Sequence, residues 1–315
     1  EAAMALALSA SLLRRRADGR IAANLQDFIY RRSVLAQGPR ADPRSPSYGL
    51  VAWTTKDAHG GVYYGDDNAR SMMGTMAAAA LLKEPRWNEP LIRCLLANLR
   101  TTGPQGFRNN RLTDDELQQK GWRHFWNTDR TNLAPHYECW LWACFLWAYA
   151  RTGFAPFLER GKGALEATLA AYPRKWRWAN GLQQERARML LPLAWLVRVE
   201  DTRKHRGWLR RIAEDLLRYH DASGAIREEV GRSGTGAYGP PKTNEAYGTN
   251  EAPLIQQNGD PLCDLLYTAN FAFAGLREAA AATGEAFYSR AEDKMAGFMC
   301  RVQVRSEKHQ EIDGG

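Results

Sequence analysis

The sequence predicts an all-α protein, a toroid of helical hairpins of the (α/α)6 type, and two observations lead to this prediction. Segments that are apolar on nearly every side alternate along the chain with segments that carry one apolar stripe and one charged face. A helix that is apolar all round is buried, whereas an amphipathic helix buries only its stripe. The connections alternate as well, being short after each apolar segment and long before the next one. Inner helices ringed by outer helices satisfy both patterns.

Five segments have the composition of inner helices: Ala2 to Leu13, Ala69 to Leu82, Cys139 to Ala150, Met189 to Val199 and Leu262 to Leu276. Each precedes an amphipathic segment that we expect on the outside: Arg20 to Leu35, Arg86 to Leu99, Pro156 to Tyr172, Arg203 to Tyr219 and Glu285 to Arg301. Only a few residues join the two members of a pair, as at Lys83 to Pro85. Each pair therefore forms an antiparallel hairpin.

The long connections all lead into inner helices: Ala36 to Gly65, Thr101 to Pro135, Pro173 to Gln184 and Asp221 to Asp260. They therefore gather at the end where the inner helices begin, and we expect a site built from loops over these amino termini. The inner helices should begin near Asp67, His136, Gln184 and Pro261. A closed ring of this kind commonly has six hairpins. Because the sequence shows five, we expect the covered chain to lack its last hairpin or to form one pair otherwise.

The bulk properties predict one domain over residues 1–315. With 315 residues, of which 44% are hydrophobic, the chain is long enough to bury a large core. The apolar start Ala2 to Leu13 resembles a signal peptide, but no basic segment precedes it and Arg14 to Arg16 follow it, so a helix is favoured. The longest apolar run, Cys139 to Ala150, is too short to cross a bilayer. We expect no membrane partner, and the sequence leaves the compartment open.

The net charge of +8 and the isoelectric point near 9.3 invite a nucleic-acid reading. The basic residues are, however, spread along the outer helices, and no nucleic-acid-binding motif is present, so we expect no such partner. The charge also suits an anionic sugar such as a uronic acid. All five cysteines lie inside expected helices without a CxxC pair and are interpreted as buried thiols. Nucleotide-binding, zinc-protease and serine-hydrolase motifs are missing, so we expect no cofactor and no metal.

The most distinctive polar motif is Asp66-Asp67, which opens the second inner helix. One aspartate at such a position commonly caps the helix. Two adjacent carboxylates exceed that need, and Tyr64 before them and Arg70 one turn later favour an acid or base with its orienting partner. Terpene cyclases also place aspartates on helices, but their DDxxD motif needs an acid where Arg70 stands.

Aromatic and polar residues surround the start of the third inner helix. Trp122, His124 and Trp126 lie in the loop before it, and His136 and Glu138 lie in its first turn. Exposed tryptophans beside polar groups provide stacking platforms for sugar rings. The alternative is that these aromatic residues pack the loop onto the helices. The chain holds 11 Trp and 12 Tyr, which favours the carbohydrate interpretation.

The fourth inner helix opens after Trp178, which we place with Trp122 and Trp126 in the wall of a cleft at the same end. Glu185 follows in the sequence. It is a candidate for binding a substrate hydroxyl, and the alternative is a structural ion pair with Arg186 or Arg188.

Two further carboxylates are candidates near the fifth inner helix. Asp264 lies among leucines and Cys263, where a lone charge is costly, so its pKa should be raised as a general acid requires. Glu251 belongs to the Gly-, Pro-, Asn- and Tyr-rich loop from Gly231 to Asn258, which has the composition of a lid or a substrate-binding wall.

With these residues, the chain resembles the six-hairpin glycosidase superfamily, the (α/α)6 toroids that include unsaturated glucuronyl hydrolases and related glycoside hydrolases. The resemblance covers the arrangement of the whole chain and the aspartate pair at the head of an inner helix. It implies that Asp66, Asp67 and Asp264 are positions where the superfamily places catalytic aspartates.

We therefore expect a bacterial or plant polysaccharide fragment as substrate and a glycoside hydrolase that works with a pair of carboxylates. Asp67 and one partner, Asp264 or Glu251, form the expected pair, and either member is able to be the acid. A polysaccharide lyase or sugar epimerase on the same toroid is the first alternative and would depend on His124, His136 and Tyr137. A non-catalytic glycan-binding protein is the second.

Overall fold

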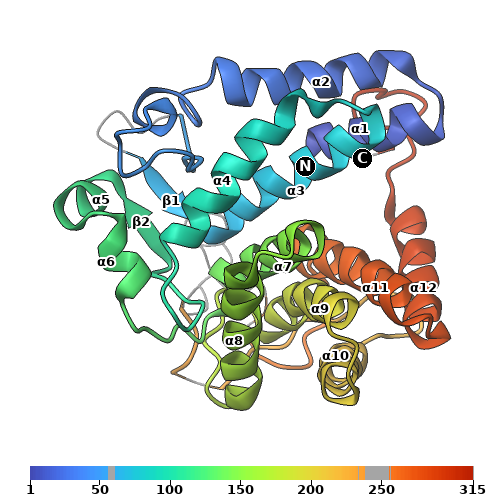
Figure 1. The fold of residues 1–315 in the computed structure, drawn as a ribbon. Helices are drawn as coiled ribbons and strands as arrows, with labels where there is room; N and C mark the ends of the chain where they lie inside the picture. Colours follow the sequence, from blue (N-terminus) through green and yellow to red (C-terminus); the bar gives the residue numbers. More distant parts are fainter. Residues whose placement is uncertain (56–60, 233, 238–254, 256, 315) are drawn as a thin grey trace. The chain divides into compact units, whose positions relative to one another are not determined.

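A computed structural model describes residues 1–55, 61–232, 234–237, 255 and 257–314 (Figure 1). The chain forms two compact units, Glu1–Ala170 and Ala171–Gly315. Helices dominate both units, and the described residues contain one small sheet of two strands. No helix among the described residues is long and apolar enough to span a membrane.

The first unit contains, in chain order, α1 (Ala2–Leu12), α2 (Arg16–Arg31), the short 3-10 helix η1 (Gly38–Ala41), β1 (Val62–Tyr64), α3 (Gly65–Leu82), η2 (Pro85–Trp87), α4 (Asn88–Arg100), β2 (Arg111–Thr113), α5 (Asp114–Lys120), α6 (Trp122–Asn127), α7 (Pro135–Thr152) and α8 (Ala155–Ala171). The helices expected from the sequence are present. The connection expected from Thr101 to Pro135 is more structured than predicted, because it contains β2, α5 and α6 (Figure 1).

The second unit contains α9 (Leu182–Val199), α10 (Arg203–Leu217), the π-helical turn η4 (Leu265–Ala269), α11 (Asn270–Thr283) and α12 (Ala286–Val302). The inner and outer characters predicted for α9 and α10 are confirmed, because α9 is buried along nearly its whole length and α10 buries a single stripe. Gly275 lets α11 approach α9 closely, since a Cβ there would lie 2.5 Å from the Cβ of Leu190.

Helix ends follow from local chemistry. Gly153 ends α7 with a φ of 67° and Gly284 ends α11 with a φ of 73°. This left-handed conformation suits glycine and allows its backbone N–H to bond back to the last turn. The chain then enters the next helix within a few residues, which produces the predicted hairpins.

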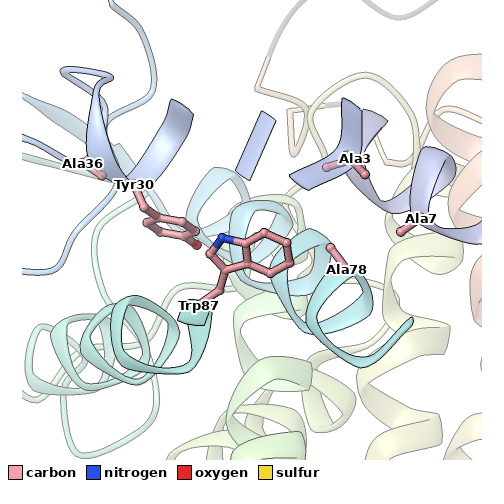
Figure 2. Packing of buried hydrophobic residues seen from close by; sticks show 7 residues of the cluster. Ala3, Ala7, Tyr30, Ala36, Ala78 and Trp87 are labelled. Atoms are coloured by element: carbon pink, nitrogen blue, oxygen red, sulfur yellow. The ribbon is translucent and has the colours of Figure 1, made fainter. Parts of the chain in front are cut away.

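The core of the first three helices forms around small residues (Figure 2). Ala3 and Ala7 of α1 pack with Ala78 of α3, and the cluster extends to Tyr30 and Trp87. The ring nitrogen of Trp87 donates to Asp27 at 2.9 Å, and the Tyr30 hydroxyl lies 2.7 Å from the Thr75 hydroxyl. The polar edges of both rings are thus satisfied inside the cluster.

The prediction that α1 is buried on all sides is wrong for this unit. Ala3 and Ala7 pack against α2 and α3, while Leu8, Leu12 and Leu13 remain 39%, 75% and 61% exposed. The composition is apolar all round, but the neighbours within the unit cover only the alanine face.

The two strands pair antiparallel, with Val62 opposite Thr113, Tyr63 opposite Leu112 and Tyr64 opposite Arg111. Of the two strands, β1 ends at Tyr64, directly before α3 in the chain. It therefore fixes the direction in which the backbone enters the helix that carries the aspartate pair.

Candidate active site

The first turn of α3 is held against the first turn of α7. Tyr64 is extended, with φ −91° and ψ 146°, and Gly65 to Asp67 follow in helical conformation. A Cβ on Gly65 would lie 2.4 Å from the Tyr137 carbonyl oxygen, so only glycine allows this contact. The aspartate pair consequently sits beside the start of α7, as predicted for two inner helices that begin at one end.

Asn68 fixes the loop that precedes β1 onto the same turn. Its amide donates to the backbone carbonyls of Val51 and Tyr64, both at 2.9 Å, and its oxygen accepts the Val51 N–H at 2.9 Å. The side chain is fully buried. Sequence reasoning missed Asn68, although a polar residue on the inner face of an apolar helix is a recognisable signal of such a bond.

The two aspartates have different surroundings. Asp66 is 7% exposed and interacts electrostatically with the buried guanidinium of Arg108. The Asp67 side chain is 28% exposed, and its Oδ1 lies 4.0 Å from Nη1 of Arg70. One carboxylate therefore faces the interior and the other lies at the surface beside a cation.

Glu138, in the first turn of α7, organises the loop that carries Arg108. Its carboxyl accepts the Arg108 backbone N–H at 3.0 Å and the Asn132 amide at 2.9 Å. Burial raises the pKa of Glu138 to about 8, although the Arg108 charge and these hydrogen bonds oppose the rise. Near neutral pH this group is thus mostly protonated, and its place in the structure is that of a positioning residue.

Aromatic rings form a row beside the aspartate pair. The ring of Trp53 meets Tyr64 edge-on at 5.7 Å, Tyr64 stacks with Tyr137 at 6.1 Å, and Tyr137 lies 4.8 Å from the ring of His136. Trp53 is 58% exposed, whereas His136 is buried. Tyr64 and His136 were expected at the site from the sequence, whereas Trp53 was not.

The place of Trp122, Trp126 and Trp178 in the wall of a cleft stays a prediction. Trp122 and Trp126 line a separate hollow of about 500 Å³ together with Leu96 and Arg100 of α4 and with Phe154. The guanidinium of Arg160, on α8, lies 4.4 Å from the centre of the Trp126 ring. His124 is exposed and packs edge-on against Phe125 at 5.2 Å. Sugar binding by Trp122, His124 and Trp126 stays a prediction.

Trp178 and Glu185 belong to the second unit and are buried. The Trp178 ring nitrogen donates to the Thr235 hydroxyl at 3.0 Å, and a Cβ at Gly231 or Gly236 would collide with this ring. Glu185 accepts the Ala179 backbone N–H at 2.9 Å. Both contacts hold the loop before α9 in place.

The apolar surroundings expected for Asp264 are wrong. Leu262, Leu265 and Leu266 are 43%, 43% and 72% exposed, while the Asp264 carboxylate is buried and accepts the Tyr267 N–H at 2.9 Å. The residue caps η4, because the helix begins at Leu265 and not near Pro261 as predicted.

Glu228 is a further buried acid of the second unit, and sequence reasoning missed it. Burial raises its pKa to about 8, and the negative charges of Asp264 and Glu229 act in the same direction. Nothing in the loop sequence distinguishes Glu228 from Glu229, which is half-buried. Glu251 lies outside the described residues, and the expectation that Asp67 and Asp264 share a pocket stays a prediction.

Within the described ranges, no group of three or more His, Cys, Asp or Glu side chains has the arrangement of a metal site. The groups at the start of α3 are two carboxylates, two arginines and an aromatic row. Such a set suits the binding and acid–base cleavage of a sugar.

No protein-family model matches the chain, and no curated protein matches it by sequence. Two solved structures do match in fold. Both are of an α-1,6-mannanase, GH76A of Salegentibacter sp. HEL1_6, in complex with α-1,6-mannotriose or α-1,6-mannotetrose. The identities are 12% and 13%, the matches cover 92% of this chain and 71% of the mannanase chain, and the TM-score is 0.58 in both cases.

The chain has the fold of this mannanase. The predicted fold class, an all-α toroid of helical hairpins, is thereby confirmed, and the resemblance to six-hairpin glycosidases holds at the level of the fold. The comparisons give no support to the likeness with unsaturated glucuronyl hydrolases. Both mannanase structures are described as inactive variants in which two consecutive aspartates are replaced, by asparagine in one and by alanine in the other.

Proposed function

We propose that the chain is a glycoside hydrolase that cleaves an α-mannan, with Asp66 and Asp67 as its working carboxylates. The observation that carries this proposal is the pair of consecutive aspartates at the start of an inner helix, beside an aromatic row. The mannanase of the same fold loses its activity when two consecutive aspartates are replaced, which supports the same dependence here.

The local geometry gives the two carboxylates different tasks. Consecutive residues of a helix point about 100° apart, so the side chains of Asp66 and Asp67 do not face the same neighbours. Asp66 lies in the interior near Arg108, and Asp67 lies near Arg70 with access to solvent. Glycoside hydrolysis needs one carboxyl group that protonates the leaving oxygen and another that activates water or attacks the sugar, and unequal surroundings separate such roles.

The aromatic row supplies the binding surface. Trp53 is exposed next to Tyr64, and Tyr64 stacks on Tyr137. Aromatic faces bind the C–H faces of sugar rings, while the nearby carboxylates and arginines accept and donate hydrogen bonds to the hydroxyls. In this proposal the sugar lies across the row, and its glycosidic bond lies over the start of α3.

The substrate class follows from the structural relative. The mannanase was obtained with α-1,6-linked manno-oligosaccharides bound, so α-1,6-linked mannan fragments are the first substrates to test. Uronic-acid-containing oligosaccharides belong in the same panel, because the net charge of +8 led to the expectation of an anionic sugar.

The test is incubation of the purified chain with a panel of reduced and unreduced oligosaccharides that includes α-1,6-mannotetraose. Cleavage is followed by reducing ends and by product mass. We expect shorter mannosides whose masses show the addition of water, and none with an Asp66→Asn/Asp67→Asn double variant. A product with a new double bond overturns the proposal in favour of a lyase, and binding without cleavage of any panel member identifies a glycan-binding protein.

A further inference from the structure

A second polar surface lies next to the aromatic row in the first unit. It is a groove of about 620 Å³ lined by residues 108–111, Thr113, Glu116 and residues 130–132. Its walls come from β2, from the start of α5 and from the segment that leads into α7. The function proposed above uses Arg108 of this lining, beside Asp66, but not Arg111 or Arg130.

The groove has an excess of positive charge. Arg111 is exposed and Arg130 is half-buried, and neither guanidinium forms a hydrogen bond or an ion pair with any residue that the structure describes. Glu116 is the only carboxylate among the lining residues, and it lies 3.6 Å from the Lys120 ammonium. Glu138, on which Arg130 acts electrostatically, is mostly protonated near neutral pH because burial raises its pKa to about 8.

The floor of the groove is fixed by hydrogen bonds. The Asn132 amide donates to the Asn110 side-chain oxygen at 2.8 Å and to Glu138 at 2.9 Å. These bonds join the two segments that carry Arg111 and Arg130. A fixed floor with two cations at its walls has the character of an anion-binding surface, since guanidinium groups bind phosphate, sulfate and carboxylate through paired hydrogen bonds.

The groove is continuous with the candidate active site. Arg111 is the cross-strand partner of Tyr64, the residue that directly precedes Gly65 and the aspartate pair. Opposed residues of antiparallel strands have Cα atoms about 4.5–5.5 Å apart. Asn132 reaches the first turn of α7 through Glu138. The groove therefore lies beside the aromatic row at Tyr64.

We propose that this groove binds an anionic substituent on a sugar of the substrate: a phosphate monoester, a sulfate ester or a carboxylate. The claim about the substrate rests on the proposed function. The claim that the groove binds an anionic group does not. The preferred substrate is then a mannan that carries such a group near the cleaved bond, and a neutral mannan is a poorer one.

The first experiment measures binding alone, by calorimetry with mannose 6-phosphate, mannose 6-sulfate, mannuronate and mannose as probes. We expect at least one anionic probe to bind more tightly than mannose, with a preference that decreases as salt is added. The double variant Arg111→Ala/Arg130→Ala should lower the affinity for that probe roughly tenfold or more, the range for charge-assisted hydrogen bonds. The probe that responds most identifies the substituent.

Arg123→Ala is the matched control, because it removes an exposed arginine of the same unit that lies outside the groove. Equal binding of mannose and all anionic probes overturns the proposal. Arg123→Ala removes one charge and the double variant removes two, so a loss of binding free energy in the Arg123 variant that is half as large or more also overturns it, because the binding then reflects net charge alone.

The second experiment separates this proposal from the proposed function. The double variant should cleave neutral α-1,6-mannotetraose at the wild-type rate and lose its preference for the substituted substrate. If the wild-type protein cleaves no mannan but binds an anionic probe through Arg111 and Arg130, the hydrolase proposal fails and the proposal that the groove binds an anion is supported. If it cleaves neutral mannan and the double variant leaves probe binding unchanged, the groove proposal fails alone.

Discussion

Two pairs of consecutive aspartates begin helices in the first unit, Asp66-Asp67 in α3 and Asp114-Asp115 in α5. In sequence the two motifs are alike. In the structure Asp114 accepts the Gly61 backbone N–H and the Tyr63 hydroxyl, each at 2.6 Å, and Asp115 is exposed.

The first pair meets different partners. Asp66 faces the buried Arg108, Asp67 lies near Arg70, and the aromatic row adjoins both. The hydrogen bonds of Asp114 tie β1 to α5 and occupy both of its oxygens. The motif and the helix dipole are common to both pairs. The cations and aromatic rings around the first pair are therefore what distinguishes it and gives it a candidate chemical role.

The largest effect should come from removing one carboxylate of the first pair. Asp67→Asn keeps the size of the side chain and removes its charge, so turnover of an established substrate should fall about a hundredfold to ten-thousandfold, the range for loss of a general acid or base. Rates are compared with those of Asp115→Asn, which makes the same change in the second pair. Equal rates for these two variants contradict the distinction between the pairs.

The next largest effect concerns Glu138, which supports the loop of Arg108. Its pKa is raised from 4.5 to about 8, so between these values the folded protein holds a proton that the unfolded chain has released. The contribution of Glu138 to stability is therefore fully present below pH 4.5 and is lost as the pH rises through about 8. At about 1.4 kcal/mol per pKa unit, the total is a few kcal/mol.

Glu138→Gln removes this dependence. The free energy of unfolding of the wild type minus that of the variant should fall by a few kcal/mol between about pH 5 and about pH 9, as measured by urea denaturation. Glu89→Gln, which replaces an exposed carboxylate of α4, is the control. A difference that stays constant or rises with pH contradicts the assignment of Glu138 as a buried, protonated acid.

The sequence predicts the helices of this molecule well, because periodicity reports directly on which faces are buried. Met189 to Val199 is an example, since its uniformly apolar pattern corresponds to the nearly complete burial of α9. The pattern does not report which neighbour covers a face. Leu8 and Leu12 of α1 illustrate this, because they are apolar and exposed.

The site was only partly predictable for the same reason. Asp66 and Asp67 stand out as a pair, and Arg70 falls near Asp67 because both lie on one helix. Trp53 lies at the site because Asn68 bonds to the backbone of its loop at Val51. This bond joins residues distant in sequence, so no local sequence pattern predicts it. Glu228 is buried by chain segments distant in sequence, so its raised pKa could not be predicted from the residues around it in the sequence.

A smaller effect, on stability, should distinguish the second pair. Asp114→Asn keeps one acceptor oxygen and replaces the other with an NH2 group, so the Tyr63 hydroxyl or the Gly61 N–H loses its charged acceptor, which costs about 1–3 kcal/mol. Turnover of the remaining folded protein should stay near that of the wild type. Urea denaturation of Asp114→Asn, of Tyr63→Phe and of the double variant gives the coupling between the two side chains. Purely additive losses contradict a structural bond between them.

The smallest effect tests the aromatic row itself. Trp53 is 58% exposed, so Trp53→Ala should leave the fold intact. If a sugar stacks on this ring, its loss weakens binding by about 0.5–1.5 kcal/mol, which corresponds to a rise in KM of roughly two- to tenfold with kcat little changed. Trp122→Ala removes a ring from the separate hollow and is the matched control. A rise in KM for Trp122→Ala and none for Trp53→Ala would contradict sugar binding by the aromatic row. The sugar would then bind at the loop before α7, as the sequence alone favoured, and the aromatic row would have no part in the site of the aspartate pair.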